Sequence, residues 1–98
     1  MKKYEIKFLS TAYRDIAEVI SDTSEVADSW AAKFVDELER HVDNLETMPK
    51  MYPIYEDMPE FRKMNVIGFL AFYTVDDKAG IVEVHRIINS RMDVKSRF

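Results

Sequence analysis

Two apolar runs near the C-terminus constrain the fold of this 98-residue chain most strongly. Residues 66–75 and 81–88 are rich in β-branched and aromatic side chains, and a polar segment, residues 76–80, separates them. This pattern predicts a β-hairpin with a five-residue loop. In the first run both alternating sets of side chains are largely apolar, which is typical of a strand that is covered on both faces. Both strands are therefore expected in the middle of a sheet.

The segments before this hairpin predict one edge strand and a first helix. Residues 2–9 alternate between apolar and charged side chains, and the lysines among them suit the edge of a sheet. A short helix should begin after an N-cap at Ser10 and end near Ile20, before a polar break at residues 21–24. Its apolar stripe consists of Tyr13, Ile16, Ala17 and Ile20.

A second, longer helix should extend to about Thr47, with Glu25 and Asp28 at the positive end of its dipole. Its apolar stripe consists of Ala27, Trp30, Ala31, Phe34, Leu38, Val42 and Leu45. Because the polar link between the two helices is short, they should form an antiparallel hairpin. Three prolines within residues 48–60 then predict a loop.

The resulting order is β-α-α-β-β-β when residues 61–66 are counted as a strand ahead of a kink near Gly68. This order favours an α+β fold, in which the helical hairpin packs on one face of an antiparallel sheet ending in a three-stranded meander. The side chains expected to meet between the layers are Ile67, Phe69, Tyr73, Trp30, Phe34 and Leu38. The other face, with Leu70 and Phe72, would be left as a working face, and the tail after Asp93 should be partly ordered at most.

Length, composition and charge limit the classes of protein to which this chain can belong. A chain of this length should form one domain, residues 1–98, and the absence of cysteine excludes disulfides, cysteine metal sites and a thiol nucleophile. The net charge is −4, yet residues 81–98 carry four basic and two acidic side chains. A basic tail on an acidic protein can present a local positive site. No apolar run approaches a membrane span, so a cytoplasmic protein is expected.

Taken together in this order, the segments resemble the RelE/ParE superfamily of toxins from bacterial type II toxin-antitoxin systems. The resemblance covers nearly the whole chain. It is carried by the opening strand and by residues 13–16, 32–38, 45, 49, 61–64, 69–76 and 86–93. It implies a small α+β toxin that a cognate antitoxin holds inactive, in a homodimeric or heterotetrameric assembly, without cofactor or metal.

Members of this superfamily act on different targets. Some cleave mRNA in the ribosomal A site as metal-independent endoribonucleases, and others poison DNA gyrase. For an endoribonuclease, the resemblance implies that Arg91, Lys63 and Arg62 are the catalytic cations that stabilise charge on the phosphate. The residues implied for substrate binding are Arg86, Arg97, Lys95, His85 and Phe98.

Two departures from the RNA-cleaving pattern leave the target open. Leu70 stands where those members have an arginine, and leucine cannot stabilise a phosphate. Asn89 stands where many relatives have a histidine, so no general base is evident. The first hypothesis is ribosome-dependent mRNA cleavage, the second is gyrase binding, and the third is a non-toxic protein that only binds an antitoxin.

Two of the implied site residues have structural alternatives. Arg86, expected on one strand face with Val82, Val84 and Ile88, could pair with an acidic side chain of a helix instead of a substrate. His85 should point the other way, where a lone histidine on a strand is usually exposed or already hydrogen-bonded. Arg91 follows the last strand and should reach the open face of the sheet together with Lys63.

Overall fold

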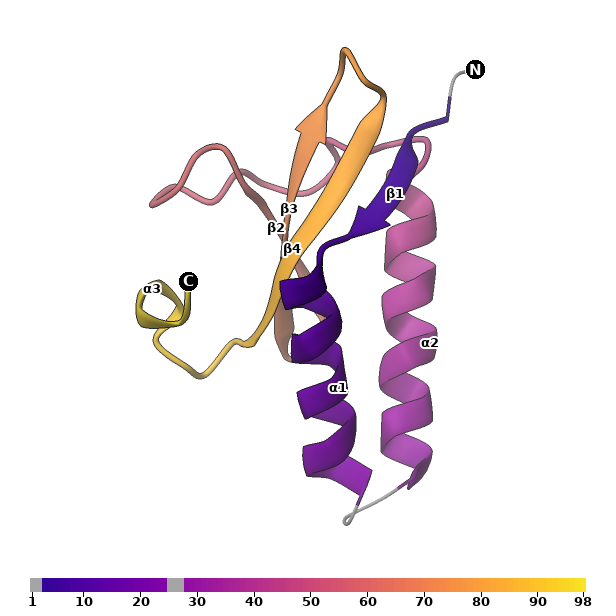
Figure 1. The fold of residues 1–98 in the computed structure, drawn as a ribbon, viewed down its shortest axis with the longest axis vertical. Coiled ribbons are helices and arrows are strands. Elements are labelled where there is room, and N and C mark those ends of the chain that lie inside the picture. Colours follow the sequence, from indigo (N-terminus) through magenta and orange to yellow (C-terminus); the bar gives the residue numbers. More distant parts are fainter. Residues whose placement is uncertain (1–2, 25–27) are drawn as a thin grey trace.

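The computed structural model describes residues 3–24 and 28–98 and shows two helices packed against one side of a twisted sheet (Figure 1). The element order matches the predicted β-α-α-β-β-β arrangement, with one short helix added at the end. The elements are β1 (Glu5–Phe8), α1 (Ser10–Ser24), α2 (Asp28–Leu45), β2 (Arg62–Val66), β3 (Phe69–Asp76), β4 (Ile81–Asn89) and α3 (Val94–Arg97).

The sheet has the strand order β1-β4-β3-β2, so both strands of the predicted hairpin are central and β1 lies at an edge, as expected. The meander β2-β3-β4 is antiparallel, but β1 pairs with β4 in parallel, so the prediction of a purely antiparallel sheet is wrong. The helical hairpin explains the difference. It returns the chain to the end of the sheet where β1 begins, since the Tyr4 N–H donates to Glu46 O at 2.8 Å. Three meander strands then leave β4 running in the direction of β1.

The kink expected near Gly68 is a complete turn between two strands. Ile67 and Gly68 have φ values of 39° and 92°, the positive values that a two-residue hairpin turn requires at both central positions. The strand that was expected to start at Val66 therefore starts at Phe69, and Val66 pairs with Phe69 across the turn. The next hairpin is one residue tighter than predicted, because Asp76 pairs with Ile81 and leaves residues 77–80 in the loop.

Helix α1 is longer than predicted and is rotated about its axis. Residues 21–24 continue the helix, so the prediction of a polar break there is wrong. Ser21 and Asp22 are exposed to solvent, where polar side chains are compatible with a helix. The helix starts one residue early because the amides of residues 12 and 13 donate to Leu9 O. Its buried residues are Ala12, Asp15 and Val19, whereas Tyr13 is 61% exposed. The expected stripe was displaced because Asp15, a charged residue, turns toward the sheet.

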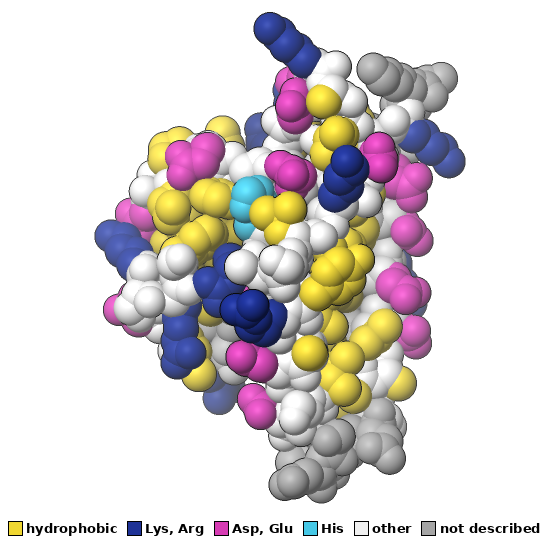
Figure 2. Space-filling model, viewed as in Figure 1, with side chains coloured by type: hydrophobic (Ala, Val, Ile, Leu, Met, Phe, Trp, Pro, Cys, Tyr) yellow, Lys and Arg dark blue, Asp and Glu magenta, His cyan; other side chains and the backbone are white. Residues whose placement is uncertain are grey.

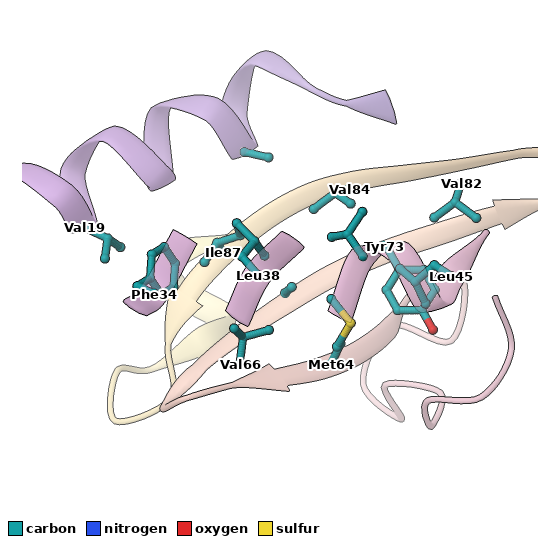
Figure 3. Packing of buried hydrophobic residues seen from close by; sticks show 13 residues of the cluster. Val19, Phe34, Leu38, Leu45, Met64, Val66, Tyr73, Val82, Val84 and Ile87 are labelled. Atoms are coloured by element: carbon teal, nitrogen blue, oxygen red, sulfur yellow. The ribbon is translucent and has the colours of Figure 1, made fainter. Parts of the chain in front are cut away.

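Helix α2 contributes most of the helical side of the core, as the stripe predicts. Phe34, Leu38, Val42 and Leu45 are buried against strands β2, β3 and β4 (Figure 3). The helix ends at Leu45, two residues before the predicted end, and the predicted positions Glu25 and Ala27 lie outside the described residues. Burying such large side chains contributes roughly 1.5–3 kcal/mol each.

The six side chains expected between the layers do meet in one cluster. The Phe34 ring lies 5.6 Å from Trp30 and 5.2 Å from Phe69, and Tyr73 is completely buried. The Tyr73 hydroxyl donates to Pro49 O at 2.7 Å, which ties the proline-rich loop to the core. Among the described residues, no helix is both long enough and apolar enough to cross a membrane.

Candidate functional site

The sheet face opposite the helices is not bare, contrary to expectation. Phe72 is fully buried in a second, smaller cluster with Phe61 and Ile88. The Tyr55 ring contacts Phe72 at 5.1 Å, and the Phe98 ring lies 4.9 Å from Phe72. The proline-rich loop and the C-terminal segment therefore cover this face, and we call Tyr55, Phe61, Phe72 and Phe98 the aromatic cap.

The C-terminal segment is helical rather than partly ordered. Helix α3 follows the turn at residues 90–93, and its Val94 packs against the second cluster. The Phe98 ring also lies 4.9 Å from Phe61. Hydrophobic side chains at both ends of α3 explain why so short a segment is held on the sheet.

Lys63 is the predicted catalytic residue that does lie on the capped face. It stands opposite Phe72 on β2, and its ammonium group lies 5.9 Å from the centre of the Tyr55 ring. Such a cation–π contact still leaves the ammonium free to meet an anion. Burial and the carboxylate of Asp57 raise the pKa of Tyr55 above its ordinary value.

Arg62 points to the other side of the same strand, where it has a structural contact. It stands opposite the buried Tyr73, and its Nη1 donates to Tyr52 O at 2.8 Å and to Lys50 O at 3.3 Å. The guanidinium therefore holds the proline-rich loop against β2. Because neighbouring strand residues face opposite ways, Arg62 and Lys63 do not converge on one phosphate.

Arg86 forms the ion pair with a helix acid that was one of its two predicted roles. Its Nε donates to Asp15 Oδ2 at 2.7 Å, and its Nη2 donates to Oδ1 at 3.2 Å. Nη1 also donates to the backbone oxygen of Arg97. Asp15 is only 8% exposed, and its hydrogen bonds raise the pKa of Arg86.

A bulge in β4 sets the directions in which His85 and Arg86 point. Phe72 pairs with Arg86 and Tyr73 pairs with Val84, so His85 has no opposite residue on β3. The bulge changes the alternation of the strand, and Ile88 faces the aromatic cap while Val82 and Val84 face the helices. The prediction that Arg86 shares one face with Val82, Val84 and Ile88 is therefore wrong.

His85 lies against the aromatic cap and has polar and aromatic partners. Its Nε2 lies 3.0 Å from Thr74 Oγ1, and its ring meets the Phe61 ring edge-on at 4.9 Å. Burial lowers the pKa of His85, and the negative charge of Glu83 acts in the opposite direction. The neutral, hydrogen-bonded imidazole is a poor candidate for a general base that meets solvent-borne substrate.

The remaining predicted cations surround α3. Figure 2 shows basic side chains gathered on the side of the molecule where α3 lies, and acidic ones along α2. Lys95 is 3.6 Å from Asp57, and Arg97 Nη2 lies 2.9 Å from Met92 Sδ. Arg91 is exposed, its N–H donates to Asn89 Oδ1 at 3.0 Å, and no ion pair of its side chain is found within residues 3–24 and 28–98.

A cavity of about 230 Å³ lies between α1, the end of β4 and the C-terminal segment. Arg86 and Arg97 line it together with the carboxylates of Asp15, Glu18 and Asp22. An entering phosphate would meet charges of both signs, and the inner guanidinium is already paired with Asp15. The arrangement favours a structural ion pair over an anion-binding site.

The sequence over residues 6–94 matches the family described as the ParE toxin of the type II toxin-antitoxin system, parDE. The chain belongs to the ParE toxin family. Within the wider RelE/ParE superfamily it is thus a type II toxin-antitoxin toxin. No curated protein sequence matches this ParE-family toxin.

Solved structures share the fold of this ParE-family toxin at low sequence identity. A chain of the chromosomal ParDE system from P. aeruginosa is 18% identical with a TM-score of 0.74, and the match covers 89% of this chain and 96% of that one. The isolated E. coli RelE toxin is 17% identical with a TM-score of 0.66, covering 96% and 93%. A chain of the intact E. coli RelBE complex is 15% identical with a TM-score of 0.67, covering 91% and 99%.

In this ParE-family toxin, Asp15 and Thr11 are the site-forming residues that the motif analysis did not single out. Leu9 N donates to Val84 O, Thr11 Oγ1 donates to His85 O at 2.6 Å, and Ile87 N donates to Asp15 Oδ2 at 2.9 Å. The two side chains thus continue the hydrogen bonds of the β4 edge after β1 has ended. Their spacing of four places them on one face of α1, the one signal in the sequence that could have found them.

Proposed function

We propose that this protein is a toxin that an antitoxin neutralises and that inhibits growth by binding a protein target, DNA gyrase, rather than by cleaving mRNA. The main support is that two of the predicted catalytic cations, Arg62 and Lys63, lie on opposite sides of β2. Arg62 holds the proline-rich loop on one side of β2, and only its neighbour Lys63 lies on the capped face. Transition-state stabilisation of a phosphate needs cations that converge on one point.

The chemistry of the capped face also supports a protein target. Leu70 is apolar at the position where the resemblance to RNA-cleaving members implies an arginine, and His85 is neutral and already bonded to Thr74. A face with an aromatic centre and a few cations at its border resembles a protein-binding surface, in which an apolar core is surrounded by a polar rim. Membership in the ParE family supports the same direction.

An antitoxin partner is supported by solved structures of similar fold that are toxin-antitoxin complexes. Solved structures similar to this chain include the intact E. coli RelBE complex and the RelBE2 complex from Mycobacterium tuberculosis. We propose that this chain is likewise held by an antitoxin, which would be encoded next to it.

Purified toxin, gyrase and relaxed plasmid test the target directly. We expect loss of supercoiling and accumulation of cleaved DNA, and we expect no ribosome-dependent cut in mRNA under the same toxin concentration. Ribosome-dependent cleavage with unaffected gyrase would overturn the proposal in favour of the endoribonuclease. A folded protein without either effect would identify a non-toxic antitoxin binder.

mRNA cleavage remains the second candidate because of Arg91. This side chain is exposed beside the basic α3, where a phosphate could reach it. In that reading Arg91 and Lys63 would bind the phosphates, and Lys95 and Arg97 would bind flanking nucleotides. The gyrase and ribosome assays above decide between the two readings.

A further inference from the structure

A polar part of the sheet face borders the aromatic cap. Val82 and Val84 face the helices, so Glu83 and His85 of the same strand face the other way. Thr74 of β3 lies beside them, and Thr74, Glu83 and His85 are all half-buried. Thr74 Oγ1 lies 3.0 Å from His85 Nε2. A hydroxyl and an imidazole within hydrogen-bond distance have the arrangement of a nucleophile and its general base.

The Thr74 hydroxyl differs from other hydroxyls of the molecule in the partner that it meets. The hydroxyls of Thr11, Tyr73 and Ser96 donate to backbone carbonyl oxygens. A backbone carbonyl does not take a proton near neutral pH, whereas a neutral imidazole does. Thr74 therefore has, unlike these three residues, a partner that can remove its proton.

The two histidine rings of the chain present their nitrogens to different groups. His41 Nδ1 lies 2.7 Å from Glu37 O, an oxygen that only accepts, so that nitrogen carries a proton. His85 instead meets a hydroxyl, which can donate. Because burial lowers the pKa of His85, its ring favours the neutral form. When Nε2 carries no proton, the Thr74 hydroxyl donates to it.

Two contacts hold the His85 ring beside Thr74. The Thr11 hydroxyl donates to His85 O at 2.6 Å, which fixes the backbone at the bulge of β4. On the other side, the Phe61 ring meets the imidazole edge-on at 4.9 Å. A base that is already held in position reacts faster than one that must first be ordered.

Glu83 adds a negative charge next to this pair. It stands opposite Thr74 in the β3–β4 register and lies two residues before His85 on the same face. Its charge acts to raise the pKa of His85, so it favours the imidazolium that forms when the ring takes a proton. On its other side Glu83 stands opposite Lys7 of β1. The three side chains thus match the roles of a nucleophile, a base and a carboxylate that stabilises the protonated base.

We propose that Thr74 is an acylation site, with His85 as its general base and Glu83 as the positioning residue that stabilises the protonated base. The donor is an activated acyl compound, an ester or acyl phosphate with a good leaving group. The product is a threonine ester whose acyl group lies at the border of the aromatic cap. The proposal goes beyond the proposed function and requires neither gyrase nor an antitoxin.

The reaction balances without a further reactant. Thr74 Oγ1 attacks the carbonyl carbon of the donor and forms a new C–O bond. The bond from this carbon to the leaving group breaks, and its electron pair goes to the leaving group. The hydroxyl proton passes to His85 Nε2 and from there to the leaving group, which returns the imidazole to its neutral form.

The full chain and p-nitrophenyl acetate test the proposal. We expect release of p-nitrophenolate and addition of a single acetyl group per chain, measured by intact mass. Lysine side chains can react with the same reagent, so fragmentation of the peptide that contains Thr74 assigns the acetyl group. Acetylation confined to lysines would overturn the proposal.

Variants identify the roles of the two reacting side chains. Thr74→Val should abolish acetylation of this peptide, and Thr74→Ser should retain it, because serine keeps the hydroxyl. His85→Gln should slow acetylation about 100-fold, the effect of losing a general base. His41→Gln is the matched control and should react as the unmodified protein does, since that ring faces Glu37 O. Circular dichroism checks that each variant is folded, and an unchanged rate in folded His85→Gln would overturn the proposal.

The pH profile separates a reacting pair from a merely structural one. The acetylation rate should rise as the pH increases through the pKa of His85, because only the neutral ring takes the proton. Glu83→Gln should move this midpoint to lower pH, since it removes the charge that favours the imidazolium. Nitrogen chemical shifts from NMR should show His85 protonated at Nδ1 and not at Nε2. A proton on Nε2 in the neutral ring, or a midpoint that Glu83→Gln leaves unchanged, would contradict the assigned roles.

Discussion

Asp15 on α1 and Arg86 on β4 form an ion pair at 2.7 Å across 71 positions of sequence. The same carboxylate accepts the Ile87 N–H, so one side chain binds both a guanidinium and a strand edge. Asp15→Ala would remove the carboxylate that binds the half-buried Arg86 guanidinium and the buried Ile87 N–H. We expect a loss of about 3 kcal/mol in the free energy of unfolding, measured with urea.

Two exposed acids of the same helix are matched controls for Asp15. Glu18→Ala and Asp22→Ala, on exposed positions of α1, should each change the free energy of unfolding by less than about 0.5 kcal/mol. An Asp15→Ala variant as stable as these controls would show that the ion pair contributes nothing to folding.

Truncation of Arg62 should lower the free energy of unfolding more than truncation of its neighbour Lys63. Arg62→Ala removes two hydrogen bonds that hold the proline-rich loop, and should lower the free energy of unfolding by about 1–2 kcal/mol. Lys63→Ala removes one cation–π contact and should cost less than about 1 kcal/mol. Equal stability of the two variants in urea denaturation would contradict the structural role of Arg62.

Arg91→Ala distinguishes the two candidate targets. Because Arg91 is exposed, we expect a melting temperature close to that of the unmodified protein. For a gyrase-binding toxin, growth inhibition should persist, with gyrase-dependent DNA breaks. A folded variant that has lost both growth inhibition and ribosome-dependent mRNA cleavage would instead support Arg91 as a phosphate-binding residue of a nuclease.

Tyr73 should make the protein less stable at alkaline pH. Burial raises the pKa of its hydroxyl to about 12, so the folded state binds this proton more tightly than the unfolded state does. The stability linked to this proton is fully present below pH ~10, the pKa of tyrosine in the unfolded chain. It is lost as the pH rises from ~10 through ~12, and it amounts to about 2–3 kcal/mol of the free energy of unfolding. Urea denaturation at several pH values measures it.

The control for this pH dependence is Tyr73→Phe, which keeps the ring and removes the ionisable group. The variant should lose the hydrogen bond to Pro49 O and also the part of the alkaline destabilisation that belongs to Tyr73. If wild type and variant lost stability in parallel between pH 10 and 12, other groups would be responsible.

Local patterns predicted most of the core, because each element has a distinct period. The α2 stripe from Phe34 to Leu45 and the alternation around Tyr73 required only the spacing of neighbours. The direction of β1 was missed, because it depends on where the helical hairpin returns the chain. Whether β1 pairs with β4 in parallel or antiparallel depends on the whole topology and not on residues 5–8.

The site was harder to predict because its parts are distant in sequence. Phe98 contacts Phe61 and Phe72 in the aromatic cap, and no local pattern links a terminal residue to a central strand. The bulge at His85 changed the face of every later residue of β4, which a strict period of two cannot anticipate. The ion pair of Arg86 was foreseen as one option, but its partner on α1 was not.

The β1–β4 pairing has a consequence for synthesis of the chain. In the sheet β1 has β4 as its neighbour, and the β4 edge is completed by Thr11 and Asp15 of α1. The N-terminal strand and helix must therefore wait for residues made more than 70 positions later. Contacts of such long range slow folding and leave apolar segments uncovered while the chain is still growing. A ribosome that stops before β4 would release a polypeptide with no partner for its first strand, so a product that lacks β4 cannot complete this sheet.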